Sequence, residues 1–187
     1  MLEQALVIHC APTLARLKPG SIFTLPCDGL REINAEMRAL RAELLPKGVV
    51  LTVLGRRGQG AIFYLYRPGE LERILSAPAT QGFLRRCGYG EFSLPAVLRV
   101  LRARLRGSED FPHEIGVFLG YPLADVVAFI RNAGRNCLFC GCWKVYSDAR
   151  GATLAFARFR KCKEVYARLF QSGCPLSRLT VGAKTAT

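Results

Sequence analysis

The chain has 187 residues, with 27 Lys and Arg against 14 Asp and Glu, a formal net charge of +13 and 50% hydrophobic residues. This apolar content argues against intrinsic disorder, and the length suits one domain. No stretch approaches the roughly 20 uncharged residues of a membrane-spanning helix. The N-terminus also lacks the basic and apolar regions of a signal peptide. We therefore expect a cytoplasmic protein without membrane insertion, formed as a single domain over residues 1–187.

The positive charge is spread along the chain. Residues 1–110 carry 16 basic and 10 acidic side chains, and residues 111–187 carry 11 and 4. This distribution is not that of a basic tail. It is compatible with a solvated basic surface, and it would also attract nucleic acids or acidic proteins.

The first half of the chain predicts two helices followed by a hairpin. A short helix is expected over residues 1–16. A second helix over about 29–45 begins after Asp28, a favourable N-cap, and carries apolar residues at helical spacing. The runs 49–54 and 61–67 predict two strands joined by a glycine-rich turn. The same glycines would fit a phosphate-binding loop, but such loops lead into a helix rather than a strand.

The second half predicts mainly helices. Short helices are expected over 69–76 and 79–87, and a clearer one over 94–106. Further helices are predicted at about 112–120, 122–133 and 148–172, with a strand at about 142–147 and a loosely ordered tail over 174–187. The fold class is thus α+β: a predominantly helical domain with a small sheet made of the hairpin at about 49–67 plus the strand at about 142–147.

Three thiols in a C-x-x-C-x-C pattern stand out among the eight cysteines. They are Cys137, Cys140 and Cys142, and their spacing is that of part of a zinc or iron–sulfur site. A fourth ligand must then come from elsewhere, with Cys162, Cys10, His9 and His113 as candidates. A redox pair of Cys137 and Cys140 and a set of free thiols, buried or partly buried, are the alternatives.

Both histidines stand beside a chemically active side chain. His9 precedes Cys10, and His113 precedes Glu114. Convergence of these residues with Cys140 would create a mixed nitrogen and sulfur site suited to zinc or iron. A meeting of Cys10 and His113 alone would create a thiolate–imidazolium nucleophile oriented by Glu114, as in a thiol-dependent enzyme.

The segment 142–147 and two helices carry further candidate residues. Lys144 and Tyr146 share one face of the predicted strand and are candidates for binding an anionic ligand, while Trp143 and Val145 are expected on the other face. A nucleic-acid interface is the alternative use of the basic helices, and it would bind in a strongly salt-dependent way. Its candidate residues are Arg99, Arg102, Arg106, Arg158 and Lys161.

Three motifs together resemble one bacterial family of unknown function, DUF3793. They read HCAPTL at 9–14, FPHEIGVFLGYPLADVVAFI at 111–130 and GRNCLFCGCWKVY at 134–146. The resemblance covers nearly the whole chain, implies a single domain and carries no activity. The motif residues that it marks are His9, Cys10, His113, Glu114, Gly120, Tyr121, Cys140, Trp143, Lys144 and Tyr146.

The leading hypothesis is one pocket where the three motif segments meet. It would hold zinc, iron or a redox cofactor. The predicted metal ligands are Cys10, His9, His113, Glu114, Cys140, Cys137 and Cys142, and the predicted cofactor contacts are Lys144, Tyr146 and Tyr121. The alternatives are a nucleic-acid-binding module, a docking protein for an acidic partner such as an electron-transfer protein, and a thiol-dependent enzyme.

Overall fold

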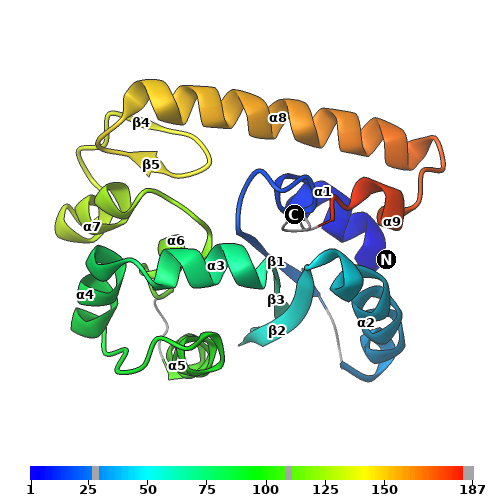
Figure 1. Ribbon diagram of the computed structural model, residues 1–187, viewed down its shortest axis with the longest axis horizontal. Coiled ribbons are helices and arrows are strands. Elements are labelled where there is room, and N and C mark those ends of the chain that lie inside the picture. The colour runs from blue at the N-terminus through cyan, green and yellow to red at the C-terminus, as the bar shows by residue number, and fades with distance from the viewer. Residues whose placement is uncertain (27–29, 108–110, 183–187) are drawn as a thin grey trace, which may run out of the picture.

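The computed structural model describes residues 1–26, 30–107 and 111–182, and two small antiparallel sheets lie among its helices (Figure 1). The larger sheet has the strand order β1-β3-β2, and the smaller one pairs β4 with β5. The strands are β1 (Gly20–Pro26), β2 (Val50–Arg57), β3 (Gly60–Tyr66), β4 (Phe139–Cys140) and β5 (Lys144–Val145). The helices are α1 (Leu2–Leu14), α2 (Leu30–Leu44), the 3-10 turn η1 (Leu45–Lys47), α3 (Pro68–Leu75), α4 (Pro78–Arg86), α5 (Leu94–Gly107), α6 (Ile115–Phe118), α7 (Leu123–Arg131), α8 (Ala149–Gln171) and α9 (Leu176–Leu179).

The predicted α+β class with a predominance of helix is confirmed. The helices expected over 1–16, 29–45 and 94–106 are α1, α2 and α5. The glycine-rich segment is the turn between β2 and β3, which pair antiparallel, so it does not lead into a helix as a phosphate loop does. Asp28, the expected N-cap of α2, and Cys27 lie outside the described residues.

The composition of the main sheet differs from the prediction. Its third strand is β1, which pairs with β3 from Gly20 opposite Tyr66 to Pro26 opposite Gly60 and was not predicted. The strand expected at about 142–147 is shorter and pairs with β4 in a separate hairpin. The sequence does not predict β1 because this segment ends in proline and alternates weakly in polarity. It is a strand because it pairs with β3, and not because of its own strand propensity.

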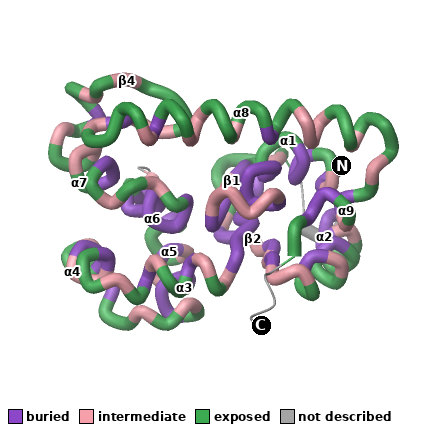
Figure 2. Tube along the Cα trace, turned by 45° about the horizontal axis from the view of Figure 1, so that its top comes forward, coloured by how far each residue is buried: buried purple, intermediate pink, exposed green. Residues whose placement is uncertain are grey.

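β3 is the centre of the fold, because every one of its residues is buried. Its side chains alternate between the two faces of the sheet. Phe63 and Leu65 join a core with α1, α2 and α9, whereas Ile62 and Tyr64 join a second core with α3, α4, α5 and α6. Figure 2 shows these buried segments in purple beneath largely exposed outer helices. The sheet therefore fixes two helical groups relative to each other.

α8 runs along one side of the molecule, from the β4–β5 hairpin to α9, and packs against α1 between them (Figure 1). Asp148 caps it as predicted, since its Oδ1 accepts a hydrogen bond from the Gly151 amide at 2.8 Å. Within α8 only Ala152 and Cys162 are buried, so most of its surface faces solvent. Across the described ranges, no helix is both long enough and apolar enough to span a membrane.

The C-terminal segment contains a short helix that packs on the core. Leu176 and Leu179 of α9 are buried in the core on the α1 side of the sheet. The segment predicted as a loosely ordered tail thus contains α9, a helix of four residues, which is too short for hydrophobic periodicity to show. Residues 183–187 lie outside the described part of the chain.

Arg67 joins the beginning and the end of the described chain. It is 2% exposed. Its Nε donates to the Thr13 carbonyl at 2.8 Å, and its Nη2 donates to the carbonyls of Leu14 at 2.8 Å and Val181 at 2.7 Å. The first two carbonyls lie at the C-terminal end of α1, where backbone oxygens have no partner within the helix. One buried side chain thus fixes α1, the sheet and the segment after α9 together.

Candidate functional site

A cavity of about 390 Å³, here called the aromatic cavity, lies between α6, α7 and the β4–β5 hairpin. Its walls come from the motif segments 111–130 and 134–146. Among the predicted site residues, the structure brings together Tyr121, His113, Cys140 and Lys144 here. The remaining lining residues are Phe111, Ile115, Gly116, Asp125, Val126, Phe129, Gly141 and Trp143.

Asp125 on α7 holds the hairpin that forms one wall of the aromatic cavity. The residue is 2% exposed. Its Oδ2 accepts from the Trp143 indole at 2.7 Å, and its Oδ1 accepts from the Tyr146 amide at 3.0 Å and from the Ser147 amide and hydroxyl at 2.9 and 2.7 Å. Burial acts to raise the pKa of this carboxyl, but the hydrogen bonds outweigh it and lower the pKa below its ordinary value. Asp125 is therefore a structural anion, already satisfied before any ligand binds.

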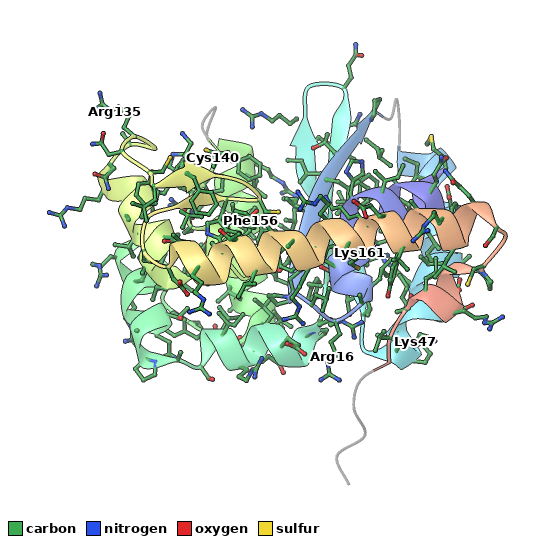
Figure 3. The ribbon with its side chains drawn as sticks, turned by 90° about the horizontal axis from the view of Figure 1, so that it is seen from above. Arg16, Lys47, Arg135, Cys140, Phe156 and Lys161 are labelled. Atoms are coloured by element: carbon green, nitrogen blue, oxygen red, sulfur yellow. The ribbon has the colours of Figure 1, made fainter. Side chains whose placement is uncertain are left out.

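A stack of aromatic rings connects the hairpin to α8. The Trp143 ring stacks on Tyr121 with centroids 5.1 Å apart and meets Phe156 of α8 edge-on at 4.5 Å. Phe156 also packs directly on Gly141, where an added Cβ would collide with the ring. Figure 3 shows Cys140 and Phe156 near one end of the long helix. Glycine at 141 thus lets α8 close against the cavity wall.

The polar side chains of the aromatic cavity gather around Phe129. The His113 ring meets Phe129 edge-on with centroids 5.0 Å apart. The Lys144 Nζ lies 5.8 Å from the centroid of the same ring and donates to the Gly134 carbonyl at 2.7 Å. Cys140 is exposed and carries a free thiol. The cavity thus combines apolar rings with an imidazole, an ammonium and a thiol.

A second cavity of about 220 Å³, here called the basic cavity, adjoins the first at Tyr121, which lines both. It contains the remaining motif segment, because His9 of α1 lines it together with Lys18, from the connection between α1 and β1, and Lys163 of α8. Burial lowers the pKa of Lys18 to about 8. Burial, followed by the charge of Lys163, also lowers the pKa of His9. The other lining residues are Pro12, Ser21, Ile22, Leu119, Cys142 and Phe159.

Two predicted site residues, Cys10 and Glu114, are buried outside both cavities. Cys10 lies on the buried face of α1, where burial raises the pKa of its thiol far above the ordinary value. Glu114 is 2% exposed and accepts hydrogen bonds from Arg104 and, at 3.2 Å, from the Tyr89 hydroxyl. Cys10 and His113 therefore do not line a common cavity, and Glu114 is paired with Arg104.

Cys137 and Tyr146 lie beside the aromatic cavity without lining it. Burial, with Cys137 and Cys140 as neighbours, raises the pKa of the Tyr146 phenol. The Tyr146 hydroxyl is buried without a hydrogen-bond partner among the described residues. The thiols of Cys140 and Cys142 line different cavities, so the C-x-x-C-x-C segment does not present its three sulfur atoms to one cavity.

The predicted zinc or iron site is not assembled in the described part of the chain. Over residues 1–26, 30–107 and 111–182, no three His, Cys, Asp or Glu side chains form a group that could hold a metal ion. The physical reason is that the hairpin and α1 turn their motif residues in different directions. The predicted ligands divide into a buried thiol, a paired carboxylate and the linings of two separate cavities.

The residues of the nucleic-acid alternative do not form one surface. Arg102 donates to the Thr52 hydroxyl at 3.0 Å and to the Val53 carbonyl at 3.4 Å, so it binds the sheet. Arg104 on the same helix pairs with Glu114. The remaining candidates are exposed: Arg99 and Arg106 on α5, and Arg158 and Lys161 on α8. These two helices lie on opposite sides of the molecule (Figure 1), which separates the two basic faces.

Three residues that shape the cavities were not predicted from the sequence. The sequence does mark Asp125, because it is an acid inside the apolar stretch LADVVAFI, and a buried carboxylate needs hydrogen-bond donors. It does not mark Lys18 or Lys163. Lys18 lies in a loop without periodicity, and Lys163 is one of several lysines and arginines on α8.

Comparison with known proteins gives a family but no activity. Residues 6–180 match the family described as protein of unknown function (DUF3793), which confirms the resemblance seen in the sequence motifs. No match was found among curated proteins or among solved structures. The matched range contains every residue that lines the two cavities.

Proposed function

We propose a function for this chain, which belongs to the DUF3793 family, from the geometry of its aromatic cavity. The protein binds a small planar organic ligand that carries an anionic or hydrogen-bond-accepting group. The single observation that carries this proposal is the cavity itself, whose rings and polar side chains converge on one volume. The cavity size, about 390 Å³, falls in the range of small-molecule sites.

The lining favours a planar ligand. Phe111, Tyr121, Phe129 and Trp143 offer aromatic faces and edges, and such rings bind other flat rings by offset stacking or edge contacts. Trp143 is held in place on both sides, by its indole hydrogen bond to Asp125 and by its contact with Phe156. A wall that is already ordered loses little conformational freedom when a ligand binds.

The polar groups favour an acceptor on that ligand. Lys144 uses one donor on the Gly134 carbonyl, and an ammonium group has three donors. His113 lies against the same ring as Lys144, so a carboxylate placed over the edge of Phe129 meets both side chains. Asp125 also lines the cavity, but its oxygens are already occupied by hydrogen bonds from the hairpin.

An organic ligand is favoured over zinc or iron because two of the side chains predicted to bind the metal are not available to it. Cys10 is a buried neutral thiol, and Glu114 is bound to Arg104. Cys140 remains available at the aromatic cavity. A redox-active ring is therefore one member of the proposed ligand class, with Cys140 beside it. A cytoplasmic location belongs to the proposal, since thiols stay reduced there.

The chain provides its own reporters for a test. Trp143 is the single tryptophan and His113 is one of two histidines, so the indole N–H and imidazole C–H signals in an NMR spectrum are easily assigned. We expect 2-naphthoate to shift the signals of Trp143 and His113 saturably. Its neutral isostere 2-naphthamide should bind about tenfold more weakly, the effect of losing one charge-assisted contact.

Matched variants complete this test. Lys144→Met should reduce 2-naphthoate affinity to that of 2-naphthamide. Lys161→Met, which removes the same charge from an exposed position outside the aromatic cavity, should leave it unchanged. Absence of a saturable shift with either probe in the unmodified protein would contradict the proposal.

A further inference from the structure

The basic cavity gathers three basic side chains from separate elements. His9 comes from α1, Lys18 from the loop that follows it and Lys163 from α8. None of the described residues that line this cavity is acidic. Lysines that share a cavity without a carboxylate disfavour each other's charged forms, and a bound anion would reverse this effect.

Lys18 is the most informative of the three. It is partly buried, and its Nζ lies 5.4 Å from the centroid of Tyr121 and 6.0 Å from that of Phe159. Within the described part of the chain it forms no ion pair. A lysine on a solvated surface extends its ammonium into water, whereas this one is held between two rings.

The charges in the basic cavity act on one another. After burial, the charge of Lys163 is a further cause that lowers the pKa of both His9 and Lys18. The neighbouring thiols of Cys10 and Cys142 act in the opposite direction on Lys18. An anion bound between these side chains would offset the repulsion between Lys18 and Lys163.

The loop that carries Lys18 is fixed in place. Gly120 has φ +74° and packs on Pro19, where an added Cβ would collide with the proline ring. Thr13 and Ser21, on either side of the loop, share a hydrogen bond of 2.8 Å between their hydroxyl groups. Lys18 is thus directed into the basic cavity by a rigid connection.

We propose that the basic cavity binds a phosphate group between Lys18, Lys163 and His9. A phosphate carries up to two negative charges and several acceptor oxygens, which suits three converging donors better than the single charge of a carboxylate. A cavity of about 220 Å³ admits such a group. This inference does not rest on the proposed function, because Tyr121 is the one described lining residue that the two cavities share.

The test uses the two histidines as separate reporters. Inorganic phosphate is titrated to about 10 mM at constant ionic strength, so that screening does not change. We expect a saturable shift of the His9 imidazole signal, while His113, in the aromatic cavity, stays unchanged. Acetate under the same conditions should bind at least about tenfold more weakly. No shift of His9, or equal binding of acetate, would overturn the phosphate site.

Two variants and a control make the result specific. Lys18→Met and Lys163→Met should each weaken phosphate binding by about tenfold, the effect of one lost charge-assisted contact. Lys163 is exposed, so its variant folds even if the Lys18 variant does not. Lys161→Met removes the same charge nearby on α8, outside the lining of the cavity. An equal effect of all three variants would mean attraction by overall charge and would overturn the site.

The source of the phosphate is a separate arm of the experiment. 2-Naphthyl phosphate carries the same group on a planar ring. Binding tighter than that of inorganic phosphate, with shifts of both His9 and His113, assigns the site to the phosphate of a larger ligand that reaches past Tyr121. Equal binding with a shift of His9 alone assigns it to free phosphate.

Discussion

The two cavities contain the same kinds of polar side chain but differ in whether those side chains already have partners within the protein. Each offers one histidine, one cysteine and at least one lysine: His113, Cys140 and Lys144 in the aromatic cavity, and His9, Cys142, Lys18 and Lys163 in the basic cavity. In the aromatic cavity the Lys144 ammonium donates to the Gly134 carbonyl, and the Asp125 carboxylate accepts hydrogen bonds from the hairpin. In the basic cavity three basic side chains line one volume, and no described lining residue is acidic.

This difference separates a site made by shape from a site made by charge. In the aromatic cavity Asp125 is fully paired and only Lys144 and His113 offer polar contacts, so a ligand gains chiefly from ring contacts that salt does not screen. The basic cavity is completed electrostatically by an anion, and its binding should weaken as ionic strength rises. Similar residue types thus acquire different roles from their neighbours.

The strongest way to separate the two cavities is Asp125→Ala. This change leaves the indole of Trp143 and the amides of Tyr146 and Ser147 without their acceptor. We expect a loss of about 3 kcal/mol in the free energy of unfolding, measured in urea. Binding of 2-naphthoate should disappear, while the His9 response to phosphate persists. A loss below about 1 kcal/mol would mean that the hairpin is held by its ring contacts alone.

The same carboxylate gives the aromatic cavity a pH signature. Because the pKa of Asp125 is lowered in the folded protein, its contribution to stability is fully present above 3.8, its ordinary value, and is lost as pH falls through the folded pKa. Asp125→Asn should therefore be less stable than the wild type at neutral pH, by about 2 kcal/mol. The difference should close in acid. A difference that is constant with pH would contradict this assignment.

Tyr121→Leu tests the wall that both cavities share. Loss of the stacked ring should weaken 2-naphthoate binding by about tenfold. Phosphate binding should fall by only about threefold, because Lys18 loses one of its two ring contacts. Calorimetric titration of both probes measures the two effects. Tyr121→Phe keeps the ring and serves as the control, and equal losses for both probes would mean that the cavities behave as one.

Lys18→Met should stabilise the protein. The pKa of Lys18 is about 8 in the folded chain and 10.5 ordinarily, so the charged side chain opposes folding most below pH 8, and less as pH rises from 8 to 10.5. Allowing for its partial exposure, we expect the melting temperature at neutral pH to rise by roughly 2–4 °C. The gain should vanish above 10.5 and also in saturating phosphate. Destabilisation at neutral pH would show that Lys18 is a structural residue.

The smallest expected effect concerns the thiols. Cys140 and Cys142 are exposed, one in each cavity, whereas the buried Cys10, with its raised pKa, should resist alkylation. We expect 2-naphthoate to slow iodoacetamide labelling of Cys140, and phosphate to slow that of Cys142, each by about threefold. Mass spectrometry of the labelled peptides measures both rates. Protection of the same cysteine by both ligands would mean that they bind in the same cavity.

The sequence predicted the elements better than the directions in which their residues point. Periodicity located α5 and α8, and a polar side chain before an apolar run located the Asp148 cap. The motifs identified His113, Cys140 and Lys144, which do line one cavity. The periodicity of 1–16 did not place Cys10 on the buried face of α1, because that helix is apolar on several sides.

The remaining parts of the site depend on contacts between distant segments. Lys18 becomes a cavity residue only when α8 brings Lys163 beside it, and the chain between them has 144 intervening residues. Glu114 lines neither cavity and pairs instead with Arg104, a residue that lies outside the motifs. Pairings of this kind are decided by tertiary packing, and a pattern read along the chain does not contain them.

The hydrogen bonds of Arg67 affect the order in which parts of the protein fold during synthesis. During synthesis α1 emerges before the sheet, but the side chain that closes its C-terminal end also binds the carbonyl of Val181. On the ribosome, the hydrogen bond from Arg67 to Val181 therefore forms only after a segment 114 positions beyond Arg67 has been made. The helices around the second core can assemble in the meantime. Nascent chains arrested before residue 181 should consequently expose α1 to proteases while α3, α4 and α5 are already protected.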